Sequence, residues 1–270
     1  MPPAEPLHLR GARRPQLLFK QKDDRNWRRT VELVNRIKPD FAIVCGDLIQ
    51  AENDPELWKK PGALDGYNDL AAMYWKTAKQ IDPAIKLYNC AGNHDVSAKP
   101  TPETLAWYRE KFGAPWYRFE HKGSLFVVLE SNLIRDPSGA PEEAAAQWKW
   151  FGETLEAAKA GAYAHKTAYM HHPLCLQAAD EKDQYFNVPK EKRAEMIKRL
   201  QDAGFAAVFC GHYHRNAYAK AGDLEIITTS SCGAPLGKDP LGFRLVTVYP
   251  DRLEQKYYSF EELGAMGAAK

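Results

Sequence analysis

Four short motifs hold most of the side chains in this chain that could do chemistry. They combine carboxylate, carboxamide and imidazole groups, a ligand set that suits iron, manganese or zinc and does not suit a thiolate cluster. Five of the eight histidines lie in them. The sequence therefore predicts a dinuclear metal site. The motifs are Gly46-Asp47, Gly92-Asn93-His94-Asp95, His171-His172-Pro173 and Gly211-His212-Tyr213-His214.

An apolar, strand-like run precedes each motif, so all four motifs are expected just beyond strand ends. Ligand sites of layered α/β proteins gather at such ends. Two cations held close together can share one carboxylate, and Asp47 is the candidate for that role. A single Gly-Asp pair would more often be a turn, and the other three motifs are what favour a metal site. The runs span residues 41–45, 85–88, 167–170 and 206–210.

These motifs resemble those of the calcineurin-like metallophosphoesterase superfamily, and the resemblance extends from about Asp24 to Leu263. The nearest similarity is to the calcineurin-like phosphoesterase domain-containing protein 1 group, described as protein serine/threonine phosphatases. The resemblance implies an α/β fold with two facing mixed β-sheets in a four-layer αββα sandwich. The segments that carry the subgroup similarity are residues 44–49, 184–187, 211–216 and 236–242.

The resemblance also implies a set of metal ligands for two divalent or trivalent ions (Mn, Fe or Zn). Asp47 would bridge both ions. Asn93, His171 and His212 would complete one metal position, and His214 would serve the other. The spacing of His212 and His214 places both on one face of an extended segment.

Catalytic roles follow from the same resemblance. His94 would protonate the leaving oxygen, a contribution of typically 10²- to 10⁴-fold in rate, with Asp95 orienting it. A metal-bound hydroxide would be the nucleophile. Asp95 could instead cap a helix, and His172 matches no ligand position and is interpreted as structural. Tyr185 and Phe186 follow the His171 motif and are interpreted as loop anchors rather than a substrate cover.

The N-terminal segment departs from the superfamily pattern. The first motif of the superfamily is an Asp, one residue, then His, or Gln in the subgroup, at the end of an apolar first strand. The only candidate here is Arg14-Pro15-Gln16. Gln16 fits as a metal ligand, but a guanidinium at Arg14 would repel a dication by several kcal/mol even at an effective dielectric near 20. Residues 7–14 contain three Arg and a Gly, so the first strand is predicted to be degenerate or missing.

Length and pattern favour one domain, since 270 residues with 44% apolar content suffice for a single large core. We expect an atypical N-terminal segment over residues 1–23, the phosphoesterase domain over 24–263 and a frayed tail over 264–270. Helical periodicity and turn residues predict further elements, and the last three strands are expected to form a second sheet. Helices are predicted over 24–38, 67–80, 102–112, 142–160 and 189–203, and strands over 116–120, 125–130, 224–229, 243–249 and 253–258.

Charge and composition limit the partners. The formal net charge is only +2, so nothing favours nucleic acid or an anionic membrane. No run approaches the roughly 20 apolar residues of a membrane span, and the first twenty residues lack a signal-peptide core. Five cysteines form no Cys-x-x-Cys pair, which favours a reducing compartment. We therefore expect a cytoplasmic protein.

Three functions stay open at this point. The first is a phosphomonoesterase acting on a phosphate ester substrate, with phosphoserine or phosphothreonine of a phosphoprotein as the expected form. The second is a phosphodiesterase acting on cyclic nucleotides or other diesters, because the same metal core serves both. The third is a catalytically impaired relative that binds a phosphorylated ligand, in which Arg14 contacts phosphate as a bidentate donor.

Overall fold

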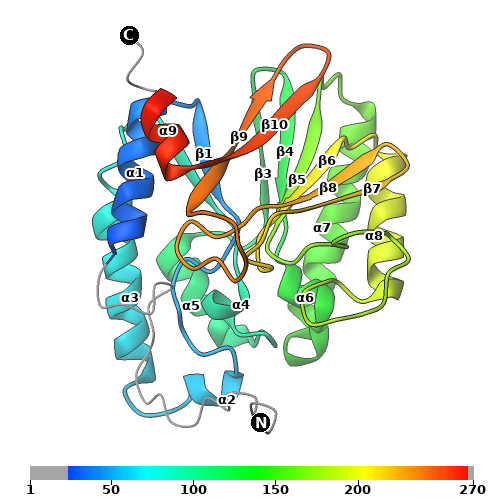
Figure 1. The fold of residues 1–270 in the computed structure, drawn as a ribbon. Coiled ribbons are helices and arrows are strands. Elements are labelled where there is room, and N and C mark those ends of the chain that lie inside the picture. Colours follow the sequence, from blue (N-terminus) through cyan, green and yellow to red (C-terminus); the bar gives the residue numbers. More distant parts are fainter. Residues whose placement is uncertain (1–23, 267–270) are drawn as a thin grey trace, which may run out of the picture.

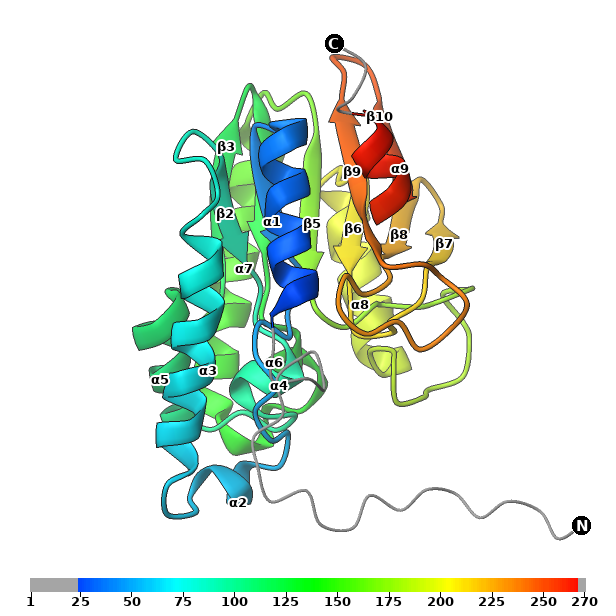
Figure 2. The same ribbon diagram turned by 60° about the vertical axis from the view of Figure 1, so that its left-hand side comes forward.

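The structure, a computed structural model, describes residues 24–266. Four layers are stacked in the order helices, strands, strands, helices (Figures 1 and 2). Three clusters of buried side chains fill the three spaces between the layers. The predicted αββα sandwich is thus confirmed.

One β-layer is a continuous six-stranded sheet in the order β3-β4-β5-β6-β8-β7. Strands β4, β5, β6 and β8 are parallel, and β3 and β7 are antiparallel edges. Its central strands are apolar on both faces because helices α7 and α8 cover one face and the second β-layer covers the other. The strands are β3 (Tyr117–His121), β4 (Ser124–Val128), β5 (Lys166–Met170), β6 (Ala207–Cys210), β7 (Ala217–Ala221) and β8 (Leu224–Thr228), and the helices are α7 (Pro141–Ala160) and α8 (Lys190–Asp202).

The facing β-layer consists of two separate pairs of strands. Strands β1 and β2 are parallel, whereas β9 and β10 form an antiparallel hairpin. Helices α1, α3 and α5 pack on the outer face of β1 and β2. These elements are α1 (Arg25–Ile37), β1 (Phe41–Val44), α3 (Ala63–Ala78), β2 (Lys86–Asn89), α5 (Pro102–Phe112), β9 (Gly242–Val248) and β10 (Leu253–Ser259).

Short helices occupy the connections. Helix α9 follows β10 and packs beside α1. The others are single turns around the loops that follow the strands. These single turns are α2 (Pro55–Trp58), α4 (Asn93–Val96), α6 (Ser131–Arg135) and the 3₁₀ turn η1 (Pro137–Gly139), whereas α9 spans Phe260–Met266.

Several sequence predictions need correction. Strand β8 joins the six-stranded sheet by pairing with β6, so the last three strands do not form one separate sheet. Strand β7 and helices α6 and α9 were not predicted, since each is short and lacks a clear period. Helix α9 continues through Met266, so residues 264–266 are helical and the prediction of a frayed tail from Gly264 is wrong for them. The predictions for residues 1–23, including Gln16 and Arg14, lie outside the described residues.

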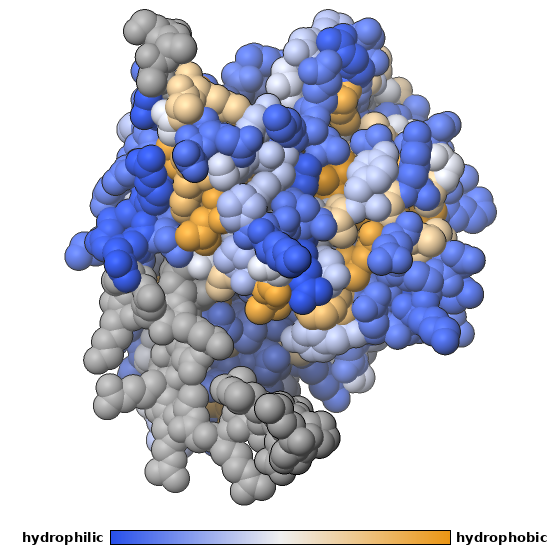
Figure 3. All heavy atoms as spheres, in the orientation of Figure 1, coloured by the Kyte–Doolittle hydropathy of each residue, from blue (hydrophilic) through white to orange (hydrophobic). Residues whose placement is uncertain are grey.

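The face of the molecule drawn in Figure 3 is mostly hydrophilic, with small, separated apolar groups among the described residues. All five cysteines are free thiols. Within residues 24–266, no helix combines the length and apolar character needed to cross a membrane.

Candidate metal centre

The four motifs meet at one end of the sandwich, as their positions after strands predicted. Asp47 follows β1 and Asn93 follows β2, in one β-layer. His171 follows β5 and His212 follows β6, in the facing layer. Because β1 is parallel to β2 and β5 is parallel to β6, each pair of strands ends at the same edge. The candidate site is therefore built from both layers.

Asp47 lies at the centre of this group and is 5% exposed. Its Oδ1 is 3.3 Å from His171 Nε2, and its Oδ2 is 3.9 Å from His214 Nε2. Burial acts to raise the pKa of the Asp47 carboxyl, but His171 and His214 outweigh it and hold that pKa well below its usual range. Asp47 is thus an anionic carboxylate with an imidazole on each side, as a bridging ligand requires.

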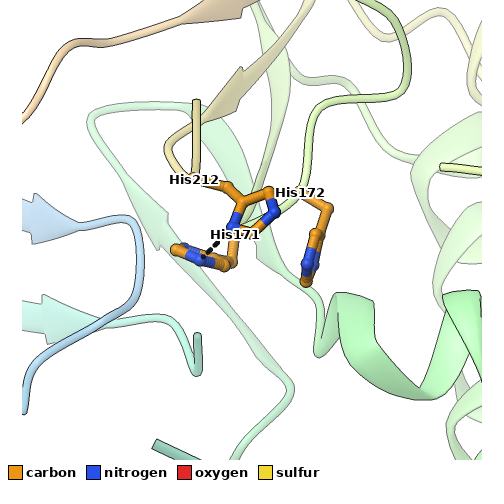
Figure 4. A group of neighbouring side chains, drawn as sticks. All are labelled: His171, His172 and His212. Atoms are coloured by element: carbon orange, nitrogen blue, oxygen red, sulfur yellow. Dashed lines mark hydrogen bonds between the residues drawn. The ribbon is translucent and has the colours of Figure 1, made fainter. Parts of the chain in front are cut away.

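The Nε2 atom of His171 has more close polar neighbours than one ring nitrogen can bond. Asn93 Oδ1 is 3.0 Å away, His212 Nδ1 is 3.1 Å away, and Asp47 Oδ1 is 3.3 Å away. Bonds of about 2.1 Å to one metal ion place neighbouring ligand atoms roughly 3.0–3.4 Å apart. These side chains therefore have the spacing of ligands around a single cation. Figure 4 shows His171 and His212 turned toward each other.

The tautomer of His171 leads to the same conclusion. Its Nδ1 lies 2.7 Å from the carbonyl oxygen of Cys45, which can only accept, so Nδ1 carries a proton. Nε2 then presents a lone pair to the oxygens of Asp47 and Asn93, an arrangement that needs a cation between them. Burial acts to lower the pKa of His171, but the Asp47 carboxylate outweighs it and raises that pKa above its usual range.

His214 is held in the same way as His171. Its Nδ1 lies 2.6 Å from the carbonyl oxygen of Ala234, which leaves Nε2 for the Oδ2 side of Asp47. Hydrogen bonds of this kind orient metal-binding imidazoles. Burial, reinforced by His171, lowers the pKa of His212 to about 2, so its ring is neutral and can act as a ligand.

Three of the candidate ligands have left-handed backbone conformations. The φ angles are 56° at Asp47, 62° at His212 and 53° at His214. Non-glycine residues adopt such angles at a cost of about 1–3 kcal/mol, and they cluster at functional sites. His212 and His214 therefore do not lie on an extended segment, as their spacing had predicted. The turn directs His212 toward His171 and His214 toward the opposite oxygen of Asp47.

Two motif glycines allow the loops to approach closely. A Cβ atom at Gly46 would lie 2.4 Å from His171 Nδ1, and one at Gly92 would lie 2.2 Å from the backbone nitrogen of Asp47. Both distances are shorter than atoms can approach. The loop after β1 can touch the loops after β2 and β5 only because these positions lack a side chain.

His172 belongs to this cluster, although its sequence context was interpreted as structural only. One ring nitrogen each of His171, His172 and His212 lies within 4.8 Å of the others. The His172 and His212 rings lie side by side (Figure 4), with their centroids 4.1 Å apart. Nδ1 of His172 lies 2.9 Å from Ser131 Oγ. Its Nε2 is buried without a hydrogen-bond partner. The adjacent ligand His171 was the only sequence signal for it.

His94 is half-buried beside Asp47, and its backbone N–H donates to Asp47 Oδ1 at 3.2 Å. Its Nδ1 is 2.7 Å from the carbonyl oxygen of Ala51, so Nδ1 is engaged within the protein and Nε2 is the ring atom left for a substrate. Gln50 Nε2 also lies 2.7 Å from this Nδ1. The ring of His94 is thus oriented by the loop that follows Asp47.

Asp95 makes the helix-capping contact that was the alternative to orienting the His94 ring. Its carboxylate accepts hydrogen bonds from the backbone N–H groups of Gly92, Leu48 and Ile49 at 2.7, 3.1 and 3.0 Å. No hydrogen bond to the His94 ring is among its contacts. Burial, with the nearby Asp47 charge, raises the pKa of Asp95 to about 7. Asp95 therefore ties the Asp47 loop to the Asn93 loop instead of orienting His94.

Aromatic side chains lie next to His212. The Tyr185 and Phe186 rings are 5.1 and 5.6 Å from the His212 ring, and Tyr185 is 55% exposed. An exposed ring cannot anchor a loop to the core, so the interpretation of Tyr185 as an anchor is wrong. The fully buried Arg193 side chain holds this loop by donating to the carbonyl oxygens of Ala179 and Val188 at 2.8 and 3.1 Å.

Comparison with known proteins agrees with this geometry. The calcineurin-like phosphoesterase family matches residues 7–216. The serine/threonine-protein phosphatase CPPED1 of Mus musculus is 36% identical over 239 residues, covering 88% of this chain and 74% of that protein. The Homo sapiens protein of the same name is 35% identical over 240 residues, with the same coverage of both chains.

A solved structure shows the same fold. The crystal structure of a dimetal phosphatase from Danio rerio has a TM-score of 0.59 at 14% identity, covering 87% of this chain and 86% of that chain. The chain therefore belongs to the calcineurin-like phosphoesterase family, whose members are hydrolases acting on phosphate esters.

Proposed function

We propose that this protein is a dinuclear-metal-dependent phosphomonoesterase that removes phosphate from phosphoserine or phosphothreonine in proteins. The observation that carries the proposal is the convergence on Asp47 of an amide oxygen and three imidazoles from both β-layers. The names of the relatives support the substrate class.

The ligand set divides into two groups around Asp47. Asn93, His171 and His212 lie on the Oδ1 side, and His214 lies on the Oδ2 side. Nitrogen and oxygen donors of this kind suit Mn, Fe or Zn ions. When bound, two such ions activate water and neutralise charge on the phosphoryl oxygens. Asp47 holds the two ligand groups together, and His172 supports His212 by ring contact.

His94 supplies the proton that the leaving oxygen needs. The carbonyl of Ala51 fixes the ring through Nδ1, so that Nε2 can carry a proton to a substrate. The Asp95 carboxylate keeps His94 near Asp47 by joining the two loops. The exposed Tyr185 ring offers an apolar surface beside the phosphate position.

The proposal is tested by hydrolysis of p-nitrophenyl phosphate in added manganese. The 270-residue chain should turn this monoester over, and the Asp47→Asn variant should not. Bis-p-nitrophenyl phosphate measures diesterase activity, and a phosphoserine peptide measures protein phosphatase activity. Preference for the diester would favour a phosphodiesterase. Binding of the phosphopeptide by folded protein without turnover would favour a binding role.

A further inference from the structure

Tyr185 lies in the loop between β5 and α8, beside the candidate metal centre. Its side chain is 55% exposed, and its ring is 5.1 Å from the ring of His212. It is not one of the candidate metal ligands, and His94 is the proposed proton donor. A polar group that stays accessible next to such a centre is positioned to contact a ligand there. The Tyr185 hydroxyl is such a group.

The backbone of Tyr185 is held in place by its neighbours. Its carbonyl oxygen accepts a hydrogen bond from Arg135 Nη2 at 2.9 Å. The backbone N–H of Gln184 donates to Asn187 Oδ1 at 3.0 Å, which closes the turn around Tyr185. A group that is held in advance binds a ligand more tightly, because no binding free energy is used to order it.

The same carbonyl connects Tyr185 to a candidate metal ligand. It lies 3.4 Å from His212 Nε2, and a carbonyl oxygen can only accept, so Nε2 carries the ring proton. Nδ1 of His212 is then left to bind a metal ion, and it lies 3.1 Å from His171 Nε2. Tyr185 therefore contacts the outer side of a ligand whose other nitrogen faces His171.

The Tyr185 hydroxyl reaches the loop that follows β1, in the facing β-layer. It forms a hydrogen bond with the side chain of Asn53. Burial raises the pKa of this hydroxyl above its usual 10, and the Asp47 charge raises it further, whereas Arg135 and the hydrogen bond with Asn53 act to lower it. The hydroxyl is therefore a neutral O–H donor within reach of the Asp47 charge.

Asn53 lies in the loop that also orients His94. The carbonyl oxygen of Ala51 is 2.7 Å from His94 Nδ1. The carbonyl oxygen of Asn53 accepts a hydrogen bond from the backbone N–H of Ala98 at 2.9 Å, which fixes this loop to the segment that carries His94. Tyr185 and His94 therefore both contact one loop, and the charge of Asp47 acts on both side chains or their backbone.

We propose that the Tyr185 hydroxyl donates a hydrogen bond to a phosphoryl oxygen of the substrate, in place of its hydrogen bond with Asn53. A hydrogen bond to an anionic oxygen is roughly twice as strong as one between neutral groups, so the exchange favours phosphate. The hydroxyl has no charge, so it adds affinity for phosphate without repelling the metal ions. Tyr185 is thus a substrate-binding residue. This inference rests on the proposed phosphoesterase function.

The test compares Tyr185→Phe with the unmodified 270-residue chain, both loaded with manganese. The substitution removes the hydroxyl and keeps the ring beside His212. Calorimetric titration with inorganic phosphate should show at least about tenfold weaker binding to the variant, since a hydrogen bond to a charged group changes a binding constant roughly 10- to 150-fold. Metal content, measured by mass spectrometry, should be the same in both proteins.

Tyr218→Phe is the matched control. Tyr218 is 50% exposed in β7, and its hydroxyl donates to Glu225 Oε1 at 2.9 Å. This variant also loses one tyrosine hydroxyl, so it should bind phosphate like the unmodified chain. Hydrolysis of p-nitrophenyl phosphate gives a second readout. Tyr185→Phe should raise KM about tenfold with a smaller change in kcat, because the hydrogen bond is already present in the bound substrate.

Three results would overturn the proposal. One is equal phosphate binding by Tyr185→Phe and the unmodified chain. Another is an unmodified, manganese-loaded chain that binds no phosphate. The third is loss of metal from Tyr185→Phe, which would give the hydroxyl a structural role. Weaker phosphate binding by the variant, with no turnover by either protein, would uphold the Tyr185 contact and reject the proposed phosphatase activity.

Discussion

The two β-layers of this protein contribute to the same site under different structural conditions. In the six-stranded sheet, β5 and β6 each pair on both sides, and Ala168 and Val208 are fully buried. In the facing layer, β1 pairs only with β2 among residues 24–266, and none of its residues is fully buried. His171 and His212 therefore follow strands with two described neighbours each, and Asp47 follows a strand with one.

From this difference we expect local opening to cost less beside β1 than beside β5 and β6. Local opening costs least where pairing and apolar contacts are fewest. Hydrogen bonds from the backbone of Leu48 and Ile49 to Asp95 add support to the loop that follows β1. Four changes test the comparison, from the largest expected effect to the smallest.

Loss of a ligand from either layer should have the largest effect. Asp47→Asn and His171→Asn should each remove metal and reduce hydrolysis more than about 100-fold, since even partners of metal ligands contribute about 10–100-fold. Mass spectrometry measures the metal content, and p-nitrophenyl phosphate turnover measures the rate of hydrolysis. Full metal content in either variant would contradict the ligand assignment.

His94→Asn should separate chemistry from metal binding. The substitution removes the proton donor, so turnover should fall about 10²- to 10⁴-fold. Metal content should match that of the unmodified protein, because His94 contacts Asp47 through its backbone nitrogen. If the variant loses metal, His94 is a ligand and the proposed proton transfer fails.

Two isoleucines allow a direct comparison of the layers. Ile226 in β8 is fully buried, whereas Ile43 in β1 is only partly buried. Ile226→Ala should lower the free energy of unfolding by about 3 kcal/mol, and Ile43→Ala by about 1 kcal/mol, because a new cavity forms only at the first site. Urea unfolding measures both, and equal losses would show that the layers are equally supported.

The loop that carries Tyr185 should show a smaller, pH-dependent effect. Burial acts to raise the pKa of Glu181. Hydrogen bonds from the Asn187 amide and the backbone N–H groups of Leu176 and Gln177 outweigh burial and lower that pKa below its usual 4.5. Its stabilisation is therefore present above pH 4.5 and is lost as pH falls through the lowered pKa.

Glu181→Gln should cost about 1 kcal/mol at pH 7, with the difference shrinking toward acid pH. Glu153→Gln, at an exposed helical position, is the control and should change stability little. Thermal unfolding at pH 7 and pH 3.5 measures the effect. A difference that does not depend on pH would contradict a role for the carboxylate charge.

Much of the fold could be predicted because it follows from local pattern. Helices α1, α5, α7 and α8 lie within two residues of their predicted bounds, since apolar spacing and Pro or acidic first turns act over a few residues. The pairing of β8 with β6 could not be predicted from its own residues. Pairing depends on which edge of a sheet is free, and that is settled by distant segments.

The sequence by itself determined the chemical identity of the site, because ligand types directly after strand ends are local information. Tertiary structure alone decided how those side chains are used. It packed the His172 ring on the His212 ring, and it paired the Asp95 carboxylate with the backbone N–H of Leu48 and not with the His94 ring. These outcomes depend on contacts between residues far apart in the chain, which strand or helix periodicity does not encode.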